Sequence, residues 1–263
     1  MGDFAYDLPT NEGRVGDDWL NMIQPIAARI PYMGLPGNHE IFNNMSHYIN
    51  RFRLPATKDN QGTNLFYSFN LGPAHFVLIN SEAYFYESLY PSIETHDNWL
   101  IKDLKQANLN RENIPWIFVF NHGALYCSND KSDCLDNALI VREHLEKILN
   151  ENSVDVMLQA HVHNYERCTA IYNDTWNLGD NETKKYLLSF SKPIYIVNGN
   201  AGYFQAHNDP FKQNKDDWHI FGSEDYGYGS FTMYIKTHIY YEQFSSEKGT
   251  EIDYFWIVKD NSL

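Results

Sequence analysis

Long apolar runs are absent from this chain. None of its 263 residues lies in a stretch that approaches the roughly 18 apolar residues of a membrane-spanning helix. The first ten residues, MGDFAYDLPT, contain neither a basic nor an apolar segment, so we expect no signal peptide in this chain. The Met1-Gly2 start does not match an N-myristoylation signal, because Tyr6 stands where such signals have serine or threonine.

Basic residues are also few. The chain has 20 Lys and Arg against 34 Asp and Glu, a formal net charge of -14 and a sequence pI near 5.1. Such a surface repels a polyphosphate backbone, so we expect no nucleic acid among the partners. A small phosphate substrate stays compatible with this charge if bound metal ions supply a local positive field.

Cysteine is scarce as well, with three residues in the chain. Cys127 and Cys134 lie in one polar loop, CSNDKSDC, and are close enough to form a small disulfide. Two free thiols are the alternative. Cys168 is left over, and we expect it to be a buried thiol.

Three N-glycosylation sequons begin at Asn44, Asn173 and Asn181. An asparagine-rich chain also produces such triplets by chance, so glycan attachment and chance occurrence are both open interpretations. Together with a disulfide, the sequons favour a secreted or lysosomal/vacuolar location for the full-length product.

Apolar periodicity predicts a mixed α/β fold in one domain over residues 1–263. Helices are expected over residues 17–30, 45–52, 98–107 and 138–149. Strands are expected over residues 65–70, 74–80, 116–120, 154–158, 194–197, 231–235, 239–244 and 253–258. Residues 201–229 show little periodicity, which is typical of a long surface loop. We expect helices covering a pair of sheets.

Four short segments combine aspartate, asparagine, histidine and tyrosine in turns. They are residues 2–6 (GDFAY), 37–40 (GNHE), 120–122 (FNH) and 160–163 (AHVH). These donors suit iron, zinc or manganese better than calcium or magnesium. Taken singly, each segment has a plain structural explanation: a turn, a core histidine or a surface pair. The ordered set is much more specific than any one of them.

The set resembles the metallophosphoesterase superfamily, and specifically the purple acid phosphatases of the iron/zinc purple acid phosphatase-like branch. GDFAY is similar to the family's GDxxY motif, GNHE to GNH(E/D) and VFNH to VxxH. AHVHNYER is similar to GHxHxYER, with Ala160 in place of glycine. The resemblance implies a four-layer α/β/β/α sandwich.

The resemblance also implies a dinuclear centre and assigns its ligands. Asp3 would bridge both metals, and Tyr6 and His163 would bind a ferric ion. The divalent partner, zinc or iron, would be held by Asn38, His122 and His161. His39 would steer phosphate and protonate the leaving alcohol, with support of a neighbouring ligand as its alternative role.

The implied activity is that of an acid phosphatase. A small phosphomonoester would bridge the two metals, and hydroxide bound to them would attack the phosphorus atom in line. Glu166 and Arg167 would orient the His-x-His turn rather than touch substrate. In the loop after His122, plant-type members carry histidines where this chain has Lys131 and Asp133. Lys131 would contact phosphate or be a solvated loop lysine.

One departure from the family pattern concerns the N-terminus. The family begins its site with a D-x-G motif on an earlier strand, whose aspartate is another ferric ligand, whereas two residues precede Asp3. We therefore expect an N-terminally truncated metallophosphoesterase domain that lacks its first strand and includes the C-terminal purple acid phosphatase segment. An alternative is a non-catalytic metal- or phosphate-binding remnant. A phosphodiesterase is less favoured, because Tyr6 is the purple acid phosphatase marker.

Overall fold

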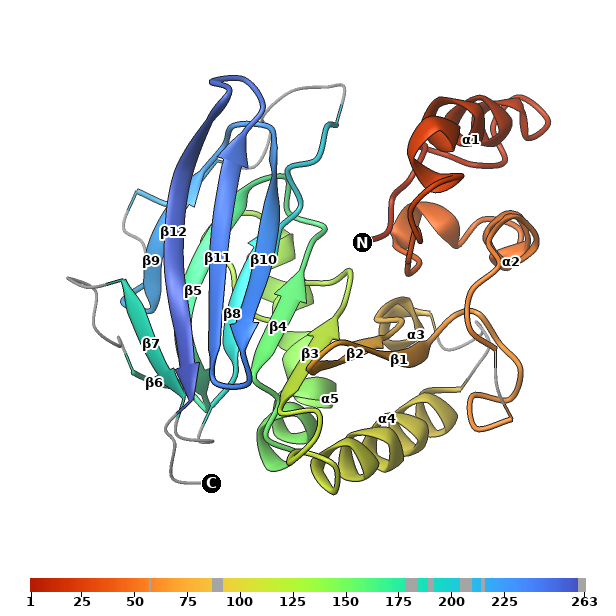
Figure 1. The fold of residues 1–263 in the computed structure, drawn as a ribbon. Helices are drawn as coiled ribbons and strands as arrows, with labels where there is room; N and C mark the ends of the chain where they lie inside the picture. The colour runs from red at the N-terminus through yellow and green to blue at the C-terminus, as the bar shows by residue number, and fades with distance from the viewer. Residues whose placement is uncertain are drawn as a thin grey trace.

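Two β-sheets and a layer of helices make up the chain (Figure 1). The computed structural model describes residues 1–56, 58–86, 92–177, 184–188, 192–203, 210–213 and 216–259. The predicted mixed α/β architecture is confirmed. Among the described residues, no helix combines the length and the apolar character needed to span a membrane.

The large sheet has eight strands in the order β1-β2-β3-β4-β8-β5-β6, and β9 pairs with β5. Its strands are β1 (Tyr67–Leu71), β2 (Ala74–Leu78), β3 (Trp116–Phe120), β4 (Val156–Gln159), β5 (Tyr165–Tyr172), β6 (Thr175–Asn177), β8 (Ile194–Asn198) and β9 (His219–Ser223). β2, β3, β4 and β8 run parallel to one another. Their carboxyl ends therefore meet at one edge of the sheet, which is where ligands bind in open α/β folds.

The small sheet has the order β10-β11-β12-β7 and packs on one face of the large sheet. Its strands are β7 (Lys185–Leu188), β10 (Gly227–Ile235), β11 (His238–Ser245) and β12 (Thr250–Lys259). Burial alternates along β11, so every second side chain points toward the large sheet. The core between the sheets joins large-sheet side chains such as Phe118 and Ile196 to Tyr241 and Phe255 of the small sheet.

Helices α4 (Ile93–Asn108) and α5 (Ala138–Glu151) cover the other face of the large sheet, whereas α1 (Arg14–Ala27) and α2 (Ser46–Arg51) lie beside the N-terminus (Figure 1). The remaining helical segments are α3 (Glu82–Phe85) and the short turns η1 (Asn38–Glu40) and η2 (Asp133–Asn137). Leu104 of α4 and Leu145 of α5 are fully buried in the core that also contains Val119 of β3. Within the described ranges the layers are helices, large sheet and small sheet. The outer face of the small sheet exposes Tyr228 and Tyr254.

Most predicted elements are present, with shifted ends. Pro25 does not interrupt α1, which starts earlier than predicted and continues to Ala27. The hairpin predicted around residues 236–238 is formed by β10 and β11. The prediction of a structureless loop over 201–229 is wrong in its later part: β9 lies there and pairs with β5, and β10 begins at Gly227. Residues 204–209 and 214–215 lie outside the described residues.

Candidate metal centre

Three of the candidate ligands lie at the carboxyl edge of two neighbouring parallel strands. His122 follows β3, and His161 and His163 follow β4. The two turns are joined by a hydrogen bond from the amide of Ala160 to the carbonyl of His122, 3.0 Å long. The parallel register therefore places side chains that are about forty residues apart in sequence at one point of the sheet edge.

The N-terminal segment reaches this edge through the carboxylate of Glu40. That carboxylate accepts hydrogen bonds from the amides of Asp3 (2.7 Å), Phe4 (3.0 Å) and Gly37 (2.8 Å). Glu40 is 2% exposed, so its negative charge depends on these three donors for stabilisation. Glu40 thus ties the turn that carries Asp3 to the turn that carries Asn38.

Three ligand atoms converge in the group expected to hold the divalent ion. Oδ1 of Asn38 lies 3.0 Å from Nε2 of His122 and 2.9 Å from Nδ1 of His161, and these two nitrogens are 3.1 Å apart. An ion about 2.0–2.1 Å from each atom would have its ligands roughly 3.4 Å apart. The group therefore matches the ligand spacing of one zinc or iron ion, slightly contracted.

The outer ring nitrogens of both histidines face oxygen acceptors. Nδ1 of His122 lies 2.8 Å from the carbonyl oxygen of Met1, and Nε2 of His161 lies 2.9 Å from Oδ1 of Asp133. Such acceptors fix the tautomer, because they hold the proton on the outer nitrogen and leave the inner nitrogen's lone pair for a metal.

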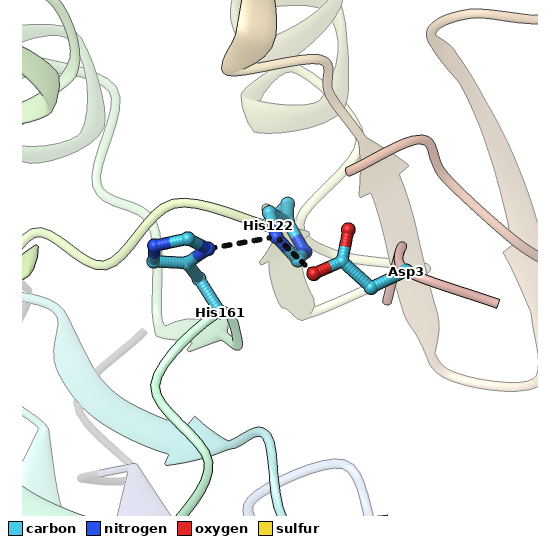
Figure 2. A group of neighbouring side chains, drawn as sticks. All are labelled: Asp3, His122 and His161. Atoms are coloured by element: carbon cyan, nitrogen blue, oxygen red, sulfur yellow. Dashed lines mark hydrogen bonds and ion pairs between the residues drawn. The ribbon is translucent and has the colours of Figure 1, made fainter. Parts of the chain in front are cut away.

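Asp3 lies between the group expected to hold the divalent ion and a second group, formed by Tyr6 and His163. Its Oδ2 atom is 3.3 Å from Nε2 of His122 and accepts a 3.4 Å hydrogen bond from the hydroxyl of Tyr6. The same hydroxyl lies 3.0 Å from Nε2 of His163. Figure 2 shows Asp3, His122 and His161 pointing toward one another from separate parts of the chain. The structure thus brings together all six residues that the sequence proposed as ligands.

The charged groups of the site change one another's pKa values. Burial alone would raise the pKa of Asp3, but the charge and hydrogen bond of His122 outweigh it and hold the pKa well below its usual range. Burial would lower the pKa of His122, yet the Asp3 carboxylate raises it to about 9. Burial and then Asp3 raise the pKa of the Tyr6 hydroxyl. A phenolate at Tyr6 therefore requires a nearby cation, as a ferric ion would provide.

Local backbone conformation also distinguishes the ligand turns. Asp3, Tyr6 and His161 have positive φ angles of 54°, 42° and 63°. This region is sparsely populated by residues with side chains, and such residues concentrate at functional sites. Gly37 has a φ of -120°, so its need for glycine is spatial: a Cβ atom there would lie 2.4 Å from Oδ1 of Asp3.

His39 lies beside the ligand cluster. Its amide donates to Oδ1 of Asp3, 3.0 Å away, while its side-chain Nδ1 pairs with Oδ1 of Asp7. Its ring centroid is 4.2 Å from that of Tyr6. Asp7 was not singled out from the sequence, although it directly follows the GDFAY motif. The pair leaves Nε2 of His39 as the ring atom that can serve a substrate.

Two cavities open onto the ligands. One of about 200 Å³ is lined by Asn38, His122 and His161 together with Glu82 and Asp133. The other, of about 330 Å³, has Asp3, Tyr6, His163, Trp19 and Tyr203 among its lining residues. The ligand cluster therefore has access to solvent on two sides, with enough room for a small phosphoester.

The Cys127–Cys134 disulfide that the sequence suggested is present, and Cys168 is a buried thiol as expected. Glu166 and Arg167 serve other contacts than predicted. Oε2 of Glu166 accepts from the amide of Ser128, 2.8 Å away, and its Oε1 lies 2.6 Å from Nδ1 of His219. The Arg167 guanidinium pairs with Asp253 of β12, so it links the two sheets.

Comparison with known proteins places this geometry in a family. The calcineurin-like phosphoesterase model matches residues 1–165, and the iron/zinc purple acid phosphatase-like protein C model matches residues 192–254. Acid phosphatase type 7 of Danio rerio is 38% identical over 99% of this chain, and that of Homo sapiens is 36% identical over 98%. The chain spans 61% and 60% of these two relatives' lengths.

A solved structure agrees with the sequence relatives. Purple acid phosphatase PPD1 from yellow lupin (Lupinus luteus) seeds superposes with a TM-score of 0.81 at 25% identity, covering 99% of this chain and 46% of that one. The family models cover both the ligand-bearing part of the chain and most of the small sheet. The chain belongs to the calcineurin-like phosphoesterase family, in its purple acid phosphatase branch.

Proposed function

We propose that the protein containing this chain hydrolyses small phosphate monoesters at acidic pH with a dinuclear Fe–Zn or Fe–Fe centre. The observation that carries this proposal is the position of Asp3. One carboxylate oxygen lies within 3.4 Å of both His122 and Tyr6, each belonging to a different ligand group. A carboxylate in this position can bridge two metal ions, as a two-metal phosphoesterase requires.

The two groups offer different donor atoms, as expected for a centre that holds one trivalent and one divalent ion. Tyr6 and His163 flank Asp3 on one side, and a phenolate favours a ferric ion. The other group contributes one amide oxygen and two imidazole nitrogens, neutral donors that suit a divalent ion. When bound, the two ions would acidify water and neutralise charge on the phosphoryl group.

His39 is the proposed acid that serves the leaving group. Asp7 holds its Nδ1, which orients the ring and leaves Nε2 to donate a proton to the departing alcohol oxygen. His39 also lies directly beside the ligand Asn38 in η1, so its ring reaches a substrate that bridges the metals without being a ligand itself.

We propose further that residues 1–263 act as one catalytic domain of a secreted or lysosomal/vacuolar protein. The Arg167–Asp253 pair supports the single domain, because it joins the sheet that carries the proposed ligands to the small sheet. The Cys127–Cys134 disulfide supports the proposed location, since such bonds form in oxidising compartments. The sequons at Asn44 and Asn173 lie on exposed turns, where glycans can attach, whereas that at Asn181 lies outside the described residues.

The test is turnover by the full-length gene product with a measured metal content. The protein is loaded with ferric iron and zinc and assayed on 4-nitrophenyl phosphate between pH 4 and 7. The expected result is two metals per chain and phosphatase activity that needs both. A chain that holds two metals yet releases no phosphate would instead be the non-catalytic metal- or phosphate-binding protein. Activity on bis(4-nitrophenyl) phosphate alone would indicate a phosphodiesterase.

A further inference from the structure

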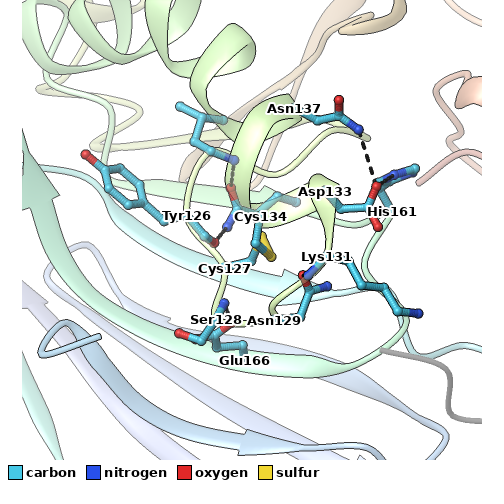
Figure 3. The surroundings of a disulfide bond; sticks show 12 residues. Tyr126, Cys127, Ser128, Asn129, Lys131, Asp133, Cys134, Asn137, His161 and Glu166 are labelled. Atoms are coloured by element: carbon cyan, nitrogen blue, oxygen red, sulfur yellow. Dashed lines mark hydrogen bonds and ion pairs between the residues drawn. A yellow bond between two sulfur atoms is a disulfide. The ribbon is translucent and has the colours of Figure 1, made fainter. Parts of the chain in front are cut away.

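The outer nitrogen of His161 is held by a residue from the disulfide loop. Nε2 of His161 lies 2.9 Å from Oδ1 of Asp133, and the side-chain Nδ2 of Asn137 donates to the same oxygen at 3.3 Å. Asp133 directly precedes Cys134 in the chain. One carboxylate oxygen of Asp133 thus contacts both the ring of His161 and the side chain of Asn137. The pairing is drawn in Figure 3.

The disulfide and the His-x-His turn also belong to one buried cluster. Cys127 and Cys134 form a buried apolar cluster with Ala124, Val162 and Val197. Val162, fully buried, stands between His161 and His163 in the sequence. The loop therefore lies against this turn: the Asp133 carboxylate pairs with His161, and the two cysteines share an apolar cluster with Val162.

The base of the loop is fixed to the body of the protein. The amide of Ser128 donates to the buried carboxylate of Glu166 on β5, and the carbonyl of Ser128 accepts from the amide of Lys212, 2.7 Å away. Ser128 and Asn129 are fully buried. One end of the loop is thus rigidly held, and the disulfide transmits that position to Cys134 and hence to Asp133.

His161 needs such support because its backbone has a φ of 63°. Residues in this left-handed region persist when surrounding contacts determine them. Without Asp133, the ring could rotate its Nδ1 away from Asn38 and His122.

We propose that the Cys127–Cys134 disulfide holds Asp133 as a positioning residue for His161, and so sets the affinity of the divalent-ion position alone. This inference rests on the proposed role of His161 as a ligand. The Tyr6 and His163 group should be unaffected, because Asp133 pairs with His161 rather than with either of them.

The first experiment measures Zn²⁺ affinity of the ferric-loaded full-length protein by competition with a chelator. Removal of an outer partner of a metal-bound histidine costs about 10–100-fold in affinity, and we expect that loss for Asp133→Ala. Asp133→Asn should recover most of it, because the amide oxygen still accepts from Nε2. Asp136→Ala is the matched control: it removes an exposed carboxylate from the same η2 turn and should leave Zn²⁺ affinity unchanged.

The second experiment tests the link to the disulfide. The double variant Cys127→Ser/Cys134→Ser should also weaken Zn²⁺ binding, and adding Asp133→Ala to it should cause little further loss, since both act through one contact. The tyrosinate–iron absorption band should persist in every variant, which reports that the ferric group is intact and the protein folded.

The outcomes separate this inference from the proposed function. Loss of Zn²⁺ affinity in Asp133→Ala with recovery in Asp133→Asn supports the inference even if no phosphatase activity is found. If His161→Ala loses zinc but Asp133→Ala does not, the inference alone fails. Fully additive losses in the triple variant would overturn the coupling to the disulfide. If His161→Ala binds zinc normally, the ligand assignment fails and the inference with it.

Discussion

Oδ2 of Asp3 lies 3.3 Å from Nε2 of His122, and the same oxygen accepts the hydrogen bond of the Tyr6 hydroxyl. Asp3 therefore belongs to both ligand groups, whereas Asn38 contacts the ligand atoms of one group only. Loss of a shared ligand and loss of a single-site ligand should have different consequences for metal content.

Asp3→Ala should reduce binding of both metals, whereas Asn38→Ala should reduce binding of the divalent ion and leave the ferric ion in place. Metal analysis after gel filtration, together with the tyrosinate–iron absorption band, distinguishes the two results. Asp18→Ala removes an exposed carboxylate from α1 and serves as the control. Retention of two metals by Asp3→Ala would contradict a bridging role.

Divalent-ion binding should be pH-dependent because of His122. Its pKa is raised to about 9 in the metal-free protein, so at neutral pH the ring carries a proton that a metal must displace. As the pH falls below 9, affinity should therefore decline, by about tenfold per unit for one displaced proton. Calorimetric Zn²⁺ titrations at pH 7 in buffers of different ionisation enthalpy should show net proton release. Binding that takes up no proton and releases none would contradict the assignment.

The same shift predicts how stability of the metal-free protein depends on pH. Because the folded pKa of His122 lies above its ordinary value of 6.5, protonation favours the folded state. The contribution of His122 to the free energy of unfolding is complete below pH 6.5 and is lost as the pH rises through about 9. Urea unfolding of the metal-stripped parent and of His122→Gln should therefore differ most at low pH. A constant difference across this range would contradict the prediction.

Gly37→Ala should weaken metal binding because the added methyl group has no room. Its Cβ would lie 2.4 Å from Oδ1 of Asp3 and 2.7 Å from Cε1 of His122, so two ligands must shift. Gly62→Ala is the contrasting control: its φ is +75°, but no atom lies within 4 Å of the added carbon. That control should lose about 1–2 kcal/mol of unfolding free energy and keep its metals. Equal metal loss in both variants would show a general folding effect instead.

The sequence identifies residues that the structure brings together, but it does not predict the contacts that support them. Strand 116–120 was predicted at its observed bounds because its apolar run is continuous and the polar residues Asn121 and His122 follow it at once. β5 was missed because it contains the charged pair Glu166 and Arg167, which look exposed in sequence. Both are buried, since Glu166 meets Ser128 and His219 and Arg167 meets Asp253, 86 residues away.

The supporting residues of the ligands were missed for the same reason. Asp7, Glu40 and Asp133 each contact a site residue that is between 28 and 37 positions away in sequence. Local periodicity does not mark partners at such separations. Glu40 had one usable signal, since it is the last residue of the GNHE motif, and Asp7 follows GDFAY directly.

Asp253→Ala should destabilise the protein without changing its metal content. The buried Arg167 guanidinium would lose its carboxylate partner, and the Tyr165 hydroxyl would lose a 2.8 Å hydrogen bond to the same group. Removing one partner of a buried pair costs about 3–5 kcal/mol. Urea unfolding of the metal-loaded protein measures this loss, and Glu251→Ala, an exposed site on the same strand, is the control. A change under 1 kcal/mol would show that the pair contributes little.

The His39–Asp7 pair should affect turnover more than metal binding. His39→Ala should lower kcat by about 10²–10⁴-fold if the imidazole protonates the leaving alcohol, and leave two metals bound. Asp7→Asn should cause a smaller loss, because the ring would remain but lose its orienting carboxylate. The double variant should be no slower than His39→Ala alone, since Asp7 acts through that ring.

The choice of substrate separates acid catalysis by His39 from a role in binding phosphate. A 4-nitrophenolate leaving group departs without a proton, whereas an alkoxide needs one. His39→Ala should therefore lose far more activity on an alkyl phosphate than on 4-nitrophenyl phosphate. If both substrates slow equally and KM rises, the ring steers phosphate rather than donating a proton. The contact between Nδ1 and Asp7 favours the donor role, because the carboxylate orients the ring and leaves its Nε2 atom to donate the proton.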